Sequence, residues 1–280
     1  MAGNVSKTTH TPNPVDEGAV TAFRRDGATP LRGLVPPQDI ADLRTAVDRL
    51  VTRPSPRAKV ASAAGDPGFF LEDFCNWPEI PAFRRFAEAG PLAEAAAALM
   101  GAREVRFYHD HVLVKESGTR TPTPTPWHQD QPYYNIDGRM TVSFWIPLDA
   151  VSRASTLEFL AGSHLGPWLM PRSFADREAK WFPEGALGDL PDIEADRAAH
   201  PILGWALEPG DAVAFHMLTL HAAAGSPTRR RVVSARYIGE DVRHAPRPWA
   251  TSPEFPSLEA ALPAGAPMDH PLFPVVWPAR

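Results

Sequence analysis

The hydrophobic positions in the first hundred residues recur at the spacing of helices. Pro36 and Pro37 suit the first turn of a helix, and the apolar residues that follow fall on one helical face. These residues are Ile40, Leu43, Val47, Leu50 and Val51. The other segments expected in this part are a short helix at 16–26, a strand at 31–35, a loop at 53–68 and a helix at 91–101.

After Gly101 the pattern changes to runs of β-branched and aromatic residues, which favour strands. The predicted strands are 105–115, 140–146, 157–160, 211–220 and 232–238. Because the helices come first and the strands follow, we expect helices that pack against a system of antiparallel sheets.

Two long segments show little periodicity. Residues 165–205 contain tryptophans and acidic residues without a regular pattern, which indicates an insertion that covers one mouth of the fold as a lid. The chain has 32 prolines, and those of 245–280 predict an extended tail that could act as a second clasp or as a surface strap.

Composition limits the classes of function. With 280 residues and 44% hydrophobic content, the chain can bury a core as one domain over 16–280, whereas residues 1–15 are polar and expected to be disordered. A net charge of −5 disfavours nucleic acid as a partner. We see neither a signal peptide nor an apolar run that could cross a membrane, and the lone Cys75 excludes an internal disulfide. We therefore expect a cytoplasmic protein that acts on a small molecule.

The stretch TPWHQDQPYY at 125–134 contains a candidate metal site. On an extended strand His128 and Asp130 would face the same side, with α-carbons ~6.6 Å apart, so both could reach one ion. His221, at the end of the predicted strand GDAVAFHMLTLH, is the best candidate for a third ligand. Two histidines and one carboxylate are the facial triad of non-heme Fe(II) oxygenases.

Other histidines offer weaker alternatives. His109, His111 and Glu116 match part of a cupin metal motif, but the glycines that flank that motif and its second half are missing. His111 could instead line a pocket. On a regular strand His216 and His221 would face opposite sides, so we expect His216 to be a packed or surface residue.

Arg230, at the start of the strand RRVVSARY, is a candidate anchor for an anion. An oxygenase of this type needs an electron source such as a 2-oxo acid, and a guanidinium can bind the far carboxylate of that acid with two hydrogen bonds. Arg229 and Arg231 are expected at a solvated strand end. Arg236 shares the face of Arg230 and could support the same anion or contact the substrate.

Six stretches in this order resemble the phytanoyl-CoA dioxygenase family of Fe(II)- and 2-oxoglutarate-dependent oxygenases, and within it bacterial members. They are LVKESG, TPWHQDQPYY, SFWIPLD, FLAGSH, PGDAVAFHMLTLH and RRVVSARY. The resemblance covers roughly residues 20 to 240 and the tail. It implies a mainly β fold with flanking helices, namely a double-stranded β-helix (jelly roll, cupin-like).

The resemblance also implies a cofactor set and residue roles. Fe(II), 2-oxoglutarate and O2 are the expected cofactors, and the products are succinate, CO2 and a hydroxylated substrate. The residues that match the iron ligands are His128, Asp130 and His221. The residues that match the surroundings of 2-oxoglutarate are Arg230, Lys115 and Trp145. Gln129 should point away from the iron.

Some questions stay open at this stage. The segment AAAGSP at 222–227 departs from the family pattern, and the short turn after it leaves Arg231 as an alternative to Arg230. The candidate substrate residues are Tyr133, Tyr134, Tyr108 and Arg236. An aspartate at 130 favours hydroxylation, since halogenating relatives have a small residue there. The alternatives are a cupin-type metal enzyme that does not use 2-oxoglutarate and a non-catalytic jelly roll that binds small molecules.

Overall fold

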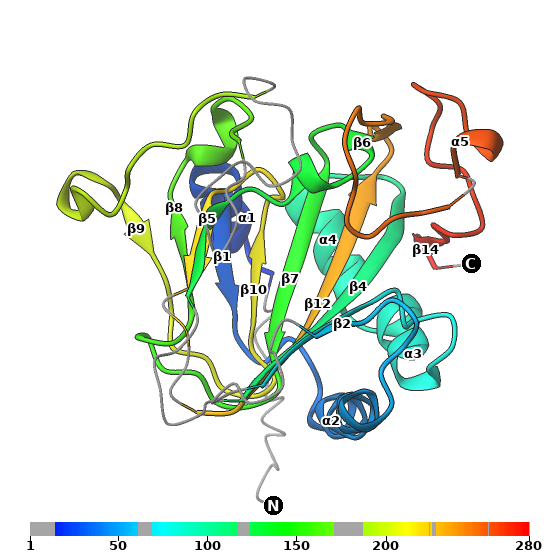
Figure 1. Ribbon diagram of the computed structural model, residues 1–280, viewed down its shortest axis with the longest axis horizontal. Helices are drawn as coiled ribbons and strands as arrows, with labels where there is room; N and C mark the ends of the chain where they lie inside the picture. The colour runs from blue at the N-terminus through cyan, green and yellow to red at the C-terminus, as the bar shows by residue number, and fades with distance from the viewer. Residues whose placement is uncertain are drawn as a thin grey trace, which may run out of the picture.

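The structure, a computed structural model, places two facing antiparallel sheets beside a group of helices (Figure 1). It describes residues 15–60, 69–116, 124–170, 187–223, 225, 228–256 and 258–279. The arrangement is mainly β with few helices, so the predicted jelly roll is confirmed. Among the described residues, we find no helix that is long and apolar enough to cross a membrane.

Four helices, α1 (Glu17–Asp26), α2 (Pro37–Thr52), α3 (Pro81–Ala89) and α4 (Leu92–Met100), pack beside the larger sheet. The short α5 (Leu258–Ala261) lies apart from them in the C-terminal segment, where Leu258 belongs to another cluster. The side chain of Asp16 caps α1, and Gly27 ends it with a positive φ of 80°. The predictions of α1, α2 and α4 are confirmed, whereas α3 was not predicted.

The larger sheet has eight strands in the order β1-β10-β7-β12-β4-β3-β2, with β14 paired to β4. Their bounds are β1 (Ala28–Leu31), β2 (Lys59–Val60), β3 (Phe69–Phe74), β4 (Val105–Glu116), β7 (Thr141–Pro147), β10 (Ala212–Phe215), β12 (Arg230–Gly239) and β14 (Val275–Trp277). The smaller sheet has the order β5-β11-β8-β9. Its strands are β5 (Thr125–His128), β8 (Leu157–Leu160), β9 (Ile202–Leu203) and β11 (His221–Ala223). A two-stranded ribbon joins β6 (Ile136–Asp137) and β13 (Arg243–His244).

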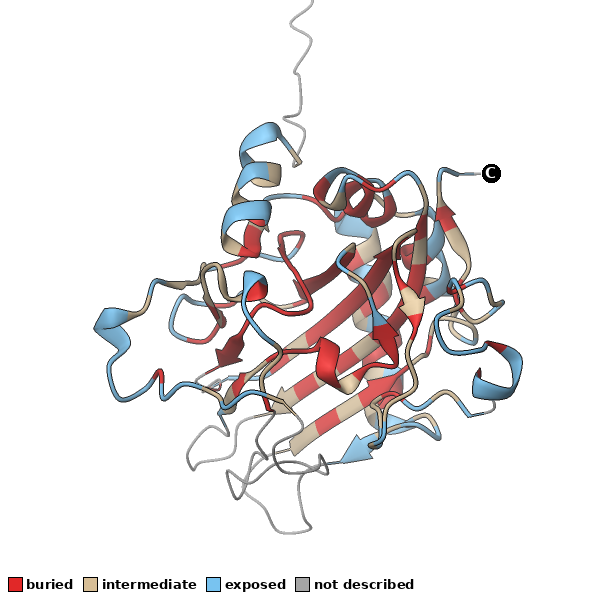
Figure 2. Ribbon diagram, turned by 90° about the horizontal axis from the view of Figure 1, so that it is seen from above, coloured by how far each residue is buried: buried red, intermediate tan, exposed pale blue. Residues whose placement is uncertain are grey.

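Side chains of the larger sheet alternate between two cores. On β7, Phe144 and Ile146 belong to the cluster that includes the helices, whereas Trp145 belongs to the cluster between the sheets with Phe159 and Phe215. Figure 2 shows buried residues along the inner strands and exposed residues on the outer helices. The space between the two sheets is therefore reached by every second residue of β4, β7 and β12.

Two predicted strands are placed differently in the structure. Strand β1 ends at Leu31 instead of starting there, because the side chain of Asp211 binds Arg32 and the backbone of Gly33 and turns the chain. Of the predicted strand 211–220 only Ala212–Phe215 is a strand, β10; a turn follows, and β11 starts after it in the other sheet. The chain leaves β10 at His216, whose N–H donates to the carbonyl of Gly27 at 2.8 Å.

The two segments without periodicity contain short pairings. Within 165–205, β9 extends the smaller sheet beside β8, while residues 171–186 lie outside the described part, so the predicted lid stays a prediction. In the predicted loop 53–68, β2 pairs with β3. Segment β14 of the tail pairs with β4. The expected disorder of 1–15 falls almost wholly on residues outside the described ranges.

Candidate metal and cosubstrate site

A cavity of about 480 Å³ lies between the two sheets and is lined by most of the candidate site residues. Strand register explains why they meet. Lys115 of β4 pairs with Arg230 of β12, and Arg236 of β12 pairs with Ser143 of β7. Because paired residues of antiparallel strands point to the same face, alternate positions from three strands converge on one cavity.

The two histidines of the candidate metal triad lie at the ends of two neighbouring strands. His128 ends β5 and His221 begins β11, and the two are register partners. Oδ1 of Asp130 lies 3.8 Å from Nε2 of His128 and 3.7 Å from Nε2 of His221. One potential ligand atom from each residue lies within 4.8 Å of the others. These separations allow one metal ion to bind all three.

The conformation of Asp130 differs from the sequence prediction. Strand β5 stops at His128, and Asp130 has helical backbone angles of φ −76° and ψ −42° as it opens a short 3₁₀ turn. The N–H groups of Asp130 and Gln131 both donate to the carbonyl of Met217 at 2.9 Å. This turn, rather than the alternation of a continuous strand, brings the carboxylate to the histidines.

Backbone hydrogen bonds fix which nitrogen of each histidine faces the site. Nδ1 of His128 lies 2.8 Å from the carbonyl of Pro126, and Nδ1 of His221 lies 3.0 Å from the carbonyl of Thr219. Since a carbonyl only accepts, Nδ1 carries the proton in both rings, and Nε2 keeps its lone pair for a metal. Two neutral imidazoles and a carboxylate fit Fe(II).

Charges around Asp130 favour its ionised form. Burial by itself raises the pKa of Asp130, but the positive charge of Arg236 lowers it well below its usual range. Burial lowers the pKa of His221, against the effect of the Asp130 carboxylate. The site therefore holds the protonation states that metal binding requires.

A second part of the cavity carries positive charge. Burial alone lowers the pKa of Arg230 to about 10, and burial together with the charge of Arg230 lowers that of Lys115 to about 8. Among the described residues, Arg230 meets no carboxylate; its Nη1 donates to the carbonyl of Ser155, and its guanidinium lies 5.6 Å from the ring of Trp145. This buried cation fits the distal carboxylate of 2-oxoglutarate.

The neighbouring arginines face the other side of β12. Arg231 pairs with Asp149 at 2.6 Å and with Asp48 at 3.0 Å, outside the cavity. Arg229 also pairs with Asp48, at 3.0 Å. Of the three consecutive arginines, only Arg230 lines the cavity, which decides between Arg230 and Arg231 as the candidate anchor.

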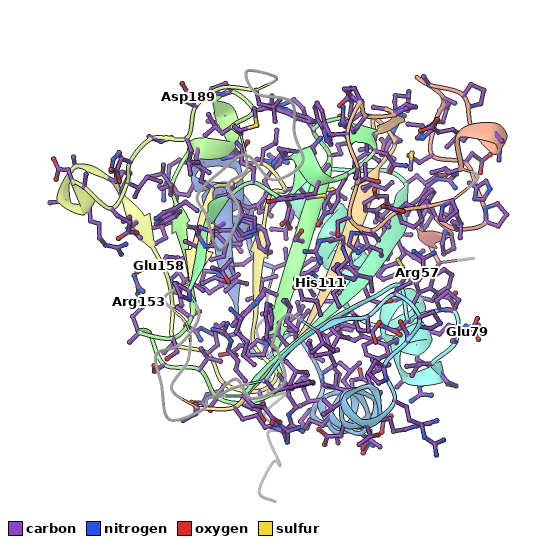
Figure 3. The ribbon with its side chains drawn as sticks, in the orientation of Figure 1. Arg57, Glu79, His111, Arg153, Glu158 and Asp189 are labelled. Atoms are coloured by element: carbon purple, nitrogen blue, oxygen red, sulfur yellow. The ribbon has the colours of Figure 1, made fainter. Side chains whose placement is uncertain are left out.

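The alternative cupin-type site does not assemble. Glu116 pairs with Arg229 at 2.9 Å, and His109 is buried beside Tyr134, so neither lines the cavity. His111 lines it, stacked on Phe74 with ring centroids 4.1 Å apart. Figure 3 labels His111, which lies on the larger sheet.

Gln129 and His216 have structural contacts. The side chain of Gln129 points away from the triad, since its Nε2 donates to the carbonyl of Leu218 at 2.9 Å and its Oε1 accepts from the N–H of Leu169 at 2.8 Å. His216 is buried, and its Nε2 lies 2.9 Å from the carbonyl of Arg139. It is a packed residue in the turn after β10 rather than a residue of one strand with His221.

The candidate substrate residues separate into three groups. Tyr133 and Tyr134 line the cavity. Tyr108 does not, because it is buried in another cluster, where its hydroxyl donates to Oδ1 of Asn135 at 2.8 Å. Arg236 also lines the cavity, and its guanidinium contacts Asp130. Further lining residues were not predicted, among them Lys59, Phe70, Glu72, Phe74 and Ser252. Three of them, Phe70, Glu72 and Phe74, are alternate residues of FFLEDF in β3, and this period of two was the signal in the sequence that could have identified them.

Comparisons with known proteins give a family and several similar folds. A model of the family described as Phytanoyl-CoA dioxygenase (PhyH) matches residues 23–232. A comparison with curated proteins gives no match. A solved structure of the epimerase SnoN in complex with Fe3+, alpha ketoglutarate and nogalamycin RO is 21% identical, with 93% of this chain and 98% of that chain covered and a TM-score of 0.72.

Two other solved structures have the same fold. The alpha ketoglutarate dependent carbocyclase SnoK from nogalamycin biosynthesis is 23% identical, with 93% of this chain and 96% of that chain covered and a TM-score of 0.69. EctD from S. alaskensis with 2-oxoglutarate and 5-hydroxyectoine is 21% identical, with 92% and 86% covered and a TM-score of 0.62. Iron and 2-oxoglutarate are the cofactors expected here, and the residues above fit both. Since the family model matches most of its length, the chain belongs to the phytanoyl-CoA dioxygenase family.

Proposed function

We propose that the protein is an Fe(II)- and 2-oxoglutarate-dependent dioxygenase that hydroxylates a C–H bond of a small molecule and releases succinate and CO2. The proposal rests on the residues that line one cavity. The triad His128, Asp130 and His221 and the cations Lys115 and Arg230 line the same space. This combination provides three ligands for a metal and two cations for the free end of a dicarboxylate that chelates the metal.

Each residue has a role that follows from its position. His128, Asp130 and His221 would hold the metal, and all three line the cavity. Arg230 and Lys115 bind and orient the distal carboxylate. When bound, Fe(II) with 2-oxoglutarate and O2 supplies the oxidising chemistry. The aromatic and aliphatic walls exclude water, which strengthens the charge interactions inside.

Hydroxylation is the outcome that Asp130 favours, because its carboxylate fills the place that a halide would need. Two similar structures are an epimerase and a carbocyclase, so the same cofactors serve other outcomes in those proteins. The position of the substrate C–H bond relative to the metal decides among them. We propose a small-molecule substrate held near Tyr133 and Tyr134, which lie in the cavity wall close to the triad.

The first experiment separates the enzyme from a binding protein. Anaerobic addition of Fe(II) and then 2-oxoglutarate should give a weak visible charge-transfer band, and exposure to air should give succinate. The matched control is Asp130→Ala, which should lose the band. A wild-type protein with neither band nor succinate would favour the non-catalytic jelly roll.

The second experiment identifies the reaction. A set of small molecules is screened for faster succinate release, and each active compound is analysed by mass spectrometry. A product heavier by one oxygen atom supports hydroxylation. A product of unchanged mass, or one that lacks two hydrogen atoms, would contradict hydroxylation while it leaves the 2-oxoglutarate-dependent activity intact.

A further inference from the structure

Arg236 is a buried arginine that contacts a candidate metal ligand. The residue is 5% exposed, and its Nη2 donates to Oδ2 of Asp130 at 3.1 Å. Ser143, its register partner on β7, donates to the same oxygen from Oγ at 3.4 Å. The other oxygen of Asp130, Oδ1, is the one that faces Nε2 of His128 and His221. The two carboxylate oxygens are thus divided between Arg236 and the metal site.

The placement of Arg236 is unfavourable in other respects. Its Nε and Nη1 are buried and have no hydrogen-bond partner among the described residues. Its guanidinium lies 5.7 Å from the ring of Tyr134 and also interacts with the hydroxyl of that residue, which compensates part of the cost. Native proteins leave few buried donors unsatisfied, and each such group needs a reason. Since an apolar side chain could fill this space without that cost, the polar contacts account for an arginine, and the charged one among them is the contact with Asp130.

We infer that Arg236 is a positioning residue that, by binding Oδ2, restricts Asp130 to offering a single oxygen, Oδ1, to the metal. The inference rests on the proposed function, since it presupposes the metal. A carboxylate can bind a metal through one oxygen or through both. Held by Arg236, Asp130 takes one coordination position and leaves the others to 2-oxoglutarate. A carboxylate free to turn could take a second position and compete with the cosubstrate.

The test measures metal binding and cosubstrate binding separately. Arg236→Met removes the donor and the charge but keeps a long side chain. Its Kd for 2-oxoglutarate, measured anaerobically on the Fe(II)-loaded protein, should rise about tenfold, because the second oxygen of Asp130 can then compete with the cosubstrate for the metal. The charge-transfer band should weaken, although Arg230 and Lys115 are unchanged. The Kd for Fe(II) should change less, because removal of a nearby positive charge favours the cation.

Three further variants control the test. Arg236→Lys keeps a donor and a charge and should recover part of the affinity for 2-oxoglutarate. Arg106→Met removes an arginine of β4 that pairs with Glu104 and Asp269 away from the cavity, and it should change neither Kd. If Arg236→Met does not fold, Arg236→Gln, which is too short to reach Oδ2 in the same way, takes its place.

Two outcomes overturn the inference while the proposed function stands. One is wild-type affinity for 2-oxoglutarate with an unchanged band in Arg236→Met, or in Arg236→Gln where that replaces it. The other is an equal loss of Fe(II) affinity, 2-oxoglutarate affinity and thermal stability that lysine does not recover, which indicates a purely structural arginine. A wild-type protein without the band would overturn the proposed function and the inference together.

Discussion

Replacing Arg230 with methionine should weaken cosubstrate binding without weakening the fold. In the ligand-free protein, burial lowers the pKa of Arg230 to about 10, and no carboxylate of the described residues compensates the charge. That lowering corresponds to on the order of 3 kcal/mol of unfavourable burial. Because the folded pKa is the lower one, this cost is fully present at neutral pH, where the arginine is charged in both states. Arg230→Met relieves it and loses the hydrogen bond to Ser155, worth about 1–3 kcal/mol. The free energy of unfolding should therefore not fall.

Binding of 2-oxoglutarate should respond in the opposite way. Removing one partner of a buried, hydrogen-bonded charge pair costs about 2–5 kcal/mol, and Lys115 remains, so we expect the lower part of that range. A loss of about 2–3 kcal/mol raises the Kd roughly 30- to 150-fold. The assay is an anaerobic titration of the Fe(II)-loaded protein with 2-oxoglutarate, read from the charge-transfer band.

Arg231→Met is the matched control on the same strand. It removes ion pairs with Asp149 and Asp48 on the opposite face and should lower the free energy of unfolding by about 1 kcal/mol, with the Kd for 2-oxoglutarate unchanged. Thermal unfolding without ligands measures the stability of both variants. The reasoning is refuted if Arg230→Met binds 2-oxoglutarate as tightly as the wild type, or if Arg231→Met loses that affinity.

Three other predictions follow from the structure. Burial and the charge of Arg230 lower the pKa of Lys115 to about 8, so its ammonium is present below that pH and lost above it. The Kd for 2-oxoglutarate should therefore rise above about pH 8, and Lys115→Met should remove this dependence on pH. Asp130→Ala should abolish hydroxylation, and full product formation without added anions would contradict the assignment of the triad. Phe144 of β7 is fully buried against the helices. Phe144→Ala should lower the free energy of unfolding by about 3–5 kcal/mol, as measured by denaturant titration.

Several elements could be predicted because their signals are local. The apolar face of α2, the β-forming run of β4 and the short β8 each carry their pattern within a few residues. Helices, strands and motif order together were enough to predict the fold class and the family. The triad was proposed from the same motifs, since the sequence shows the type and order of the candidate ligands, although it does not show their positions in space.

Other features could not be predicted because they depend on distant segments. The chain leaves β10 at His216 because Gly27, at the end of α1, offers a carbonyl there. The strand near 31–35 ends early because Asp211 binds the turn after it. No window of the sequence contains both partners of either contact.

The sequence by itself determined the family, the fold class and the set of candidate ligands, because periodicity and motif order depend only on the order of residues in the chain. Only the tertiary structure decided where those residues lie relative to one another. The register of β4, β7 and β12 turned Arg230 into the cavity and Arg231 out of it, and it brought Arg236 against Asp130. The reason is physical: which face a side chain takes, and which charge it meets, are set by pairing between strands that are far apart in sequence.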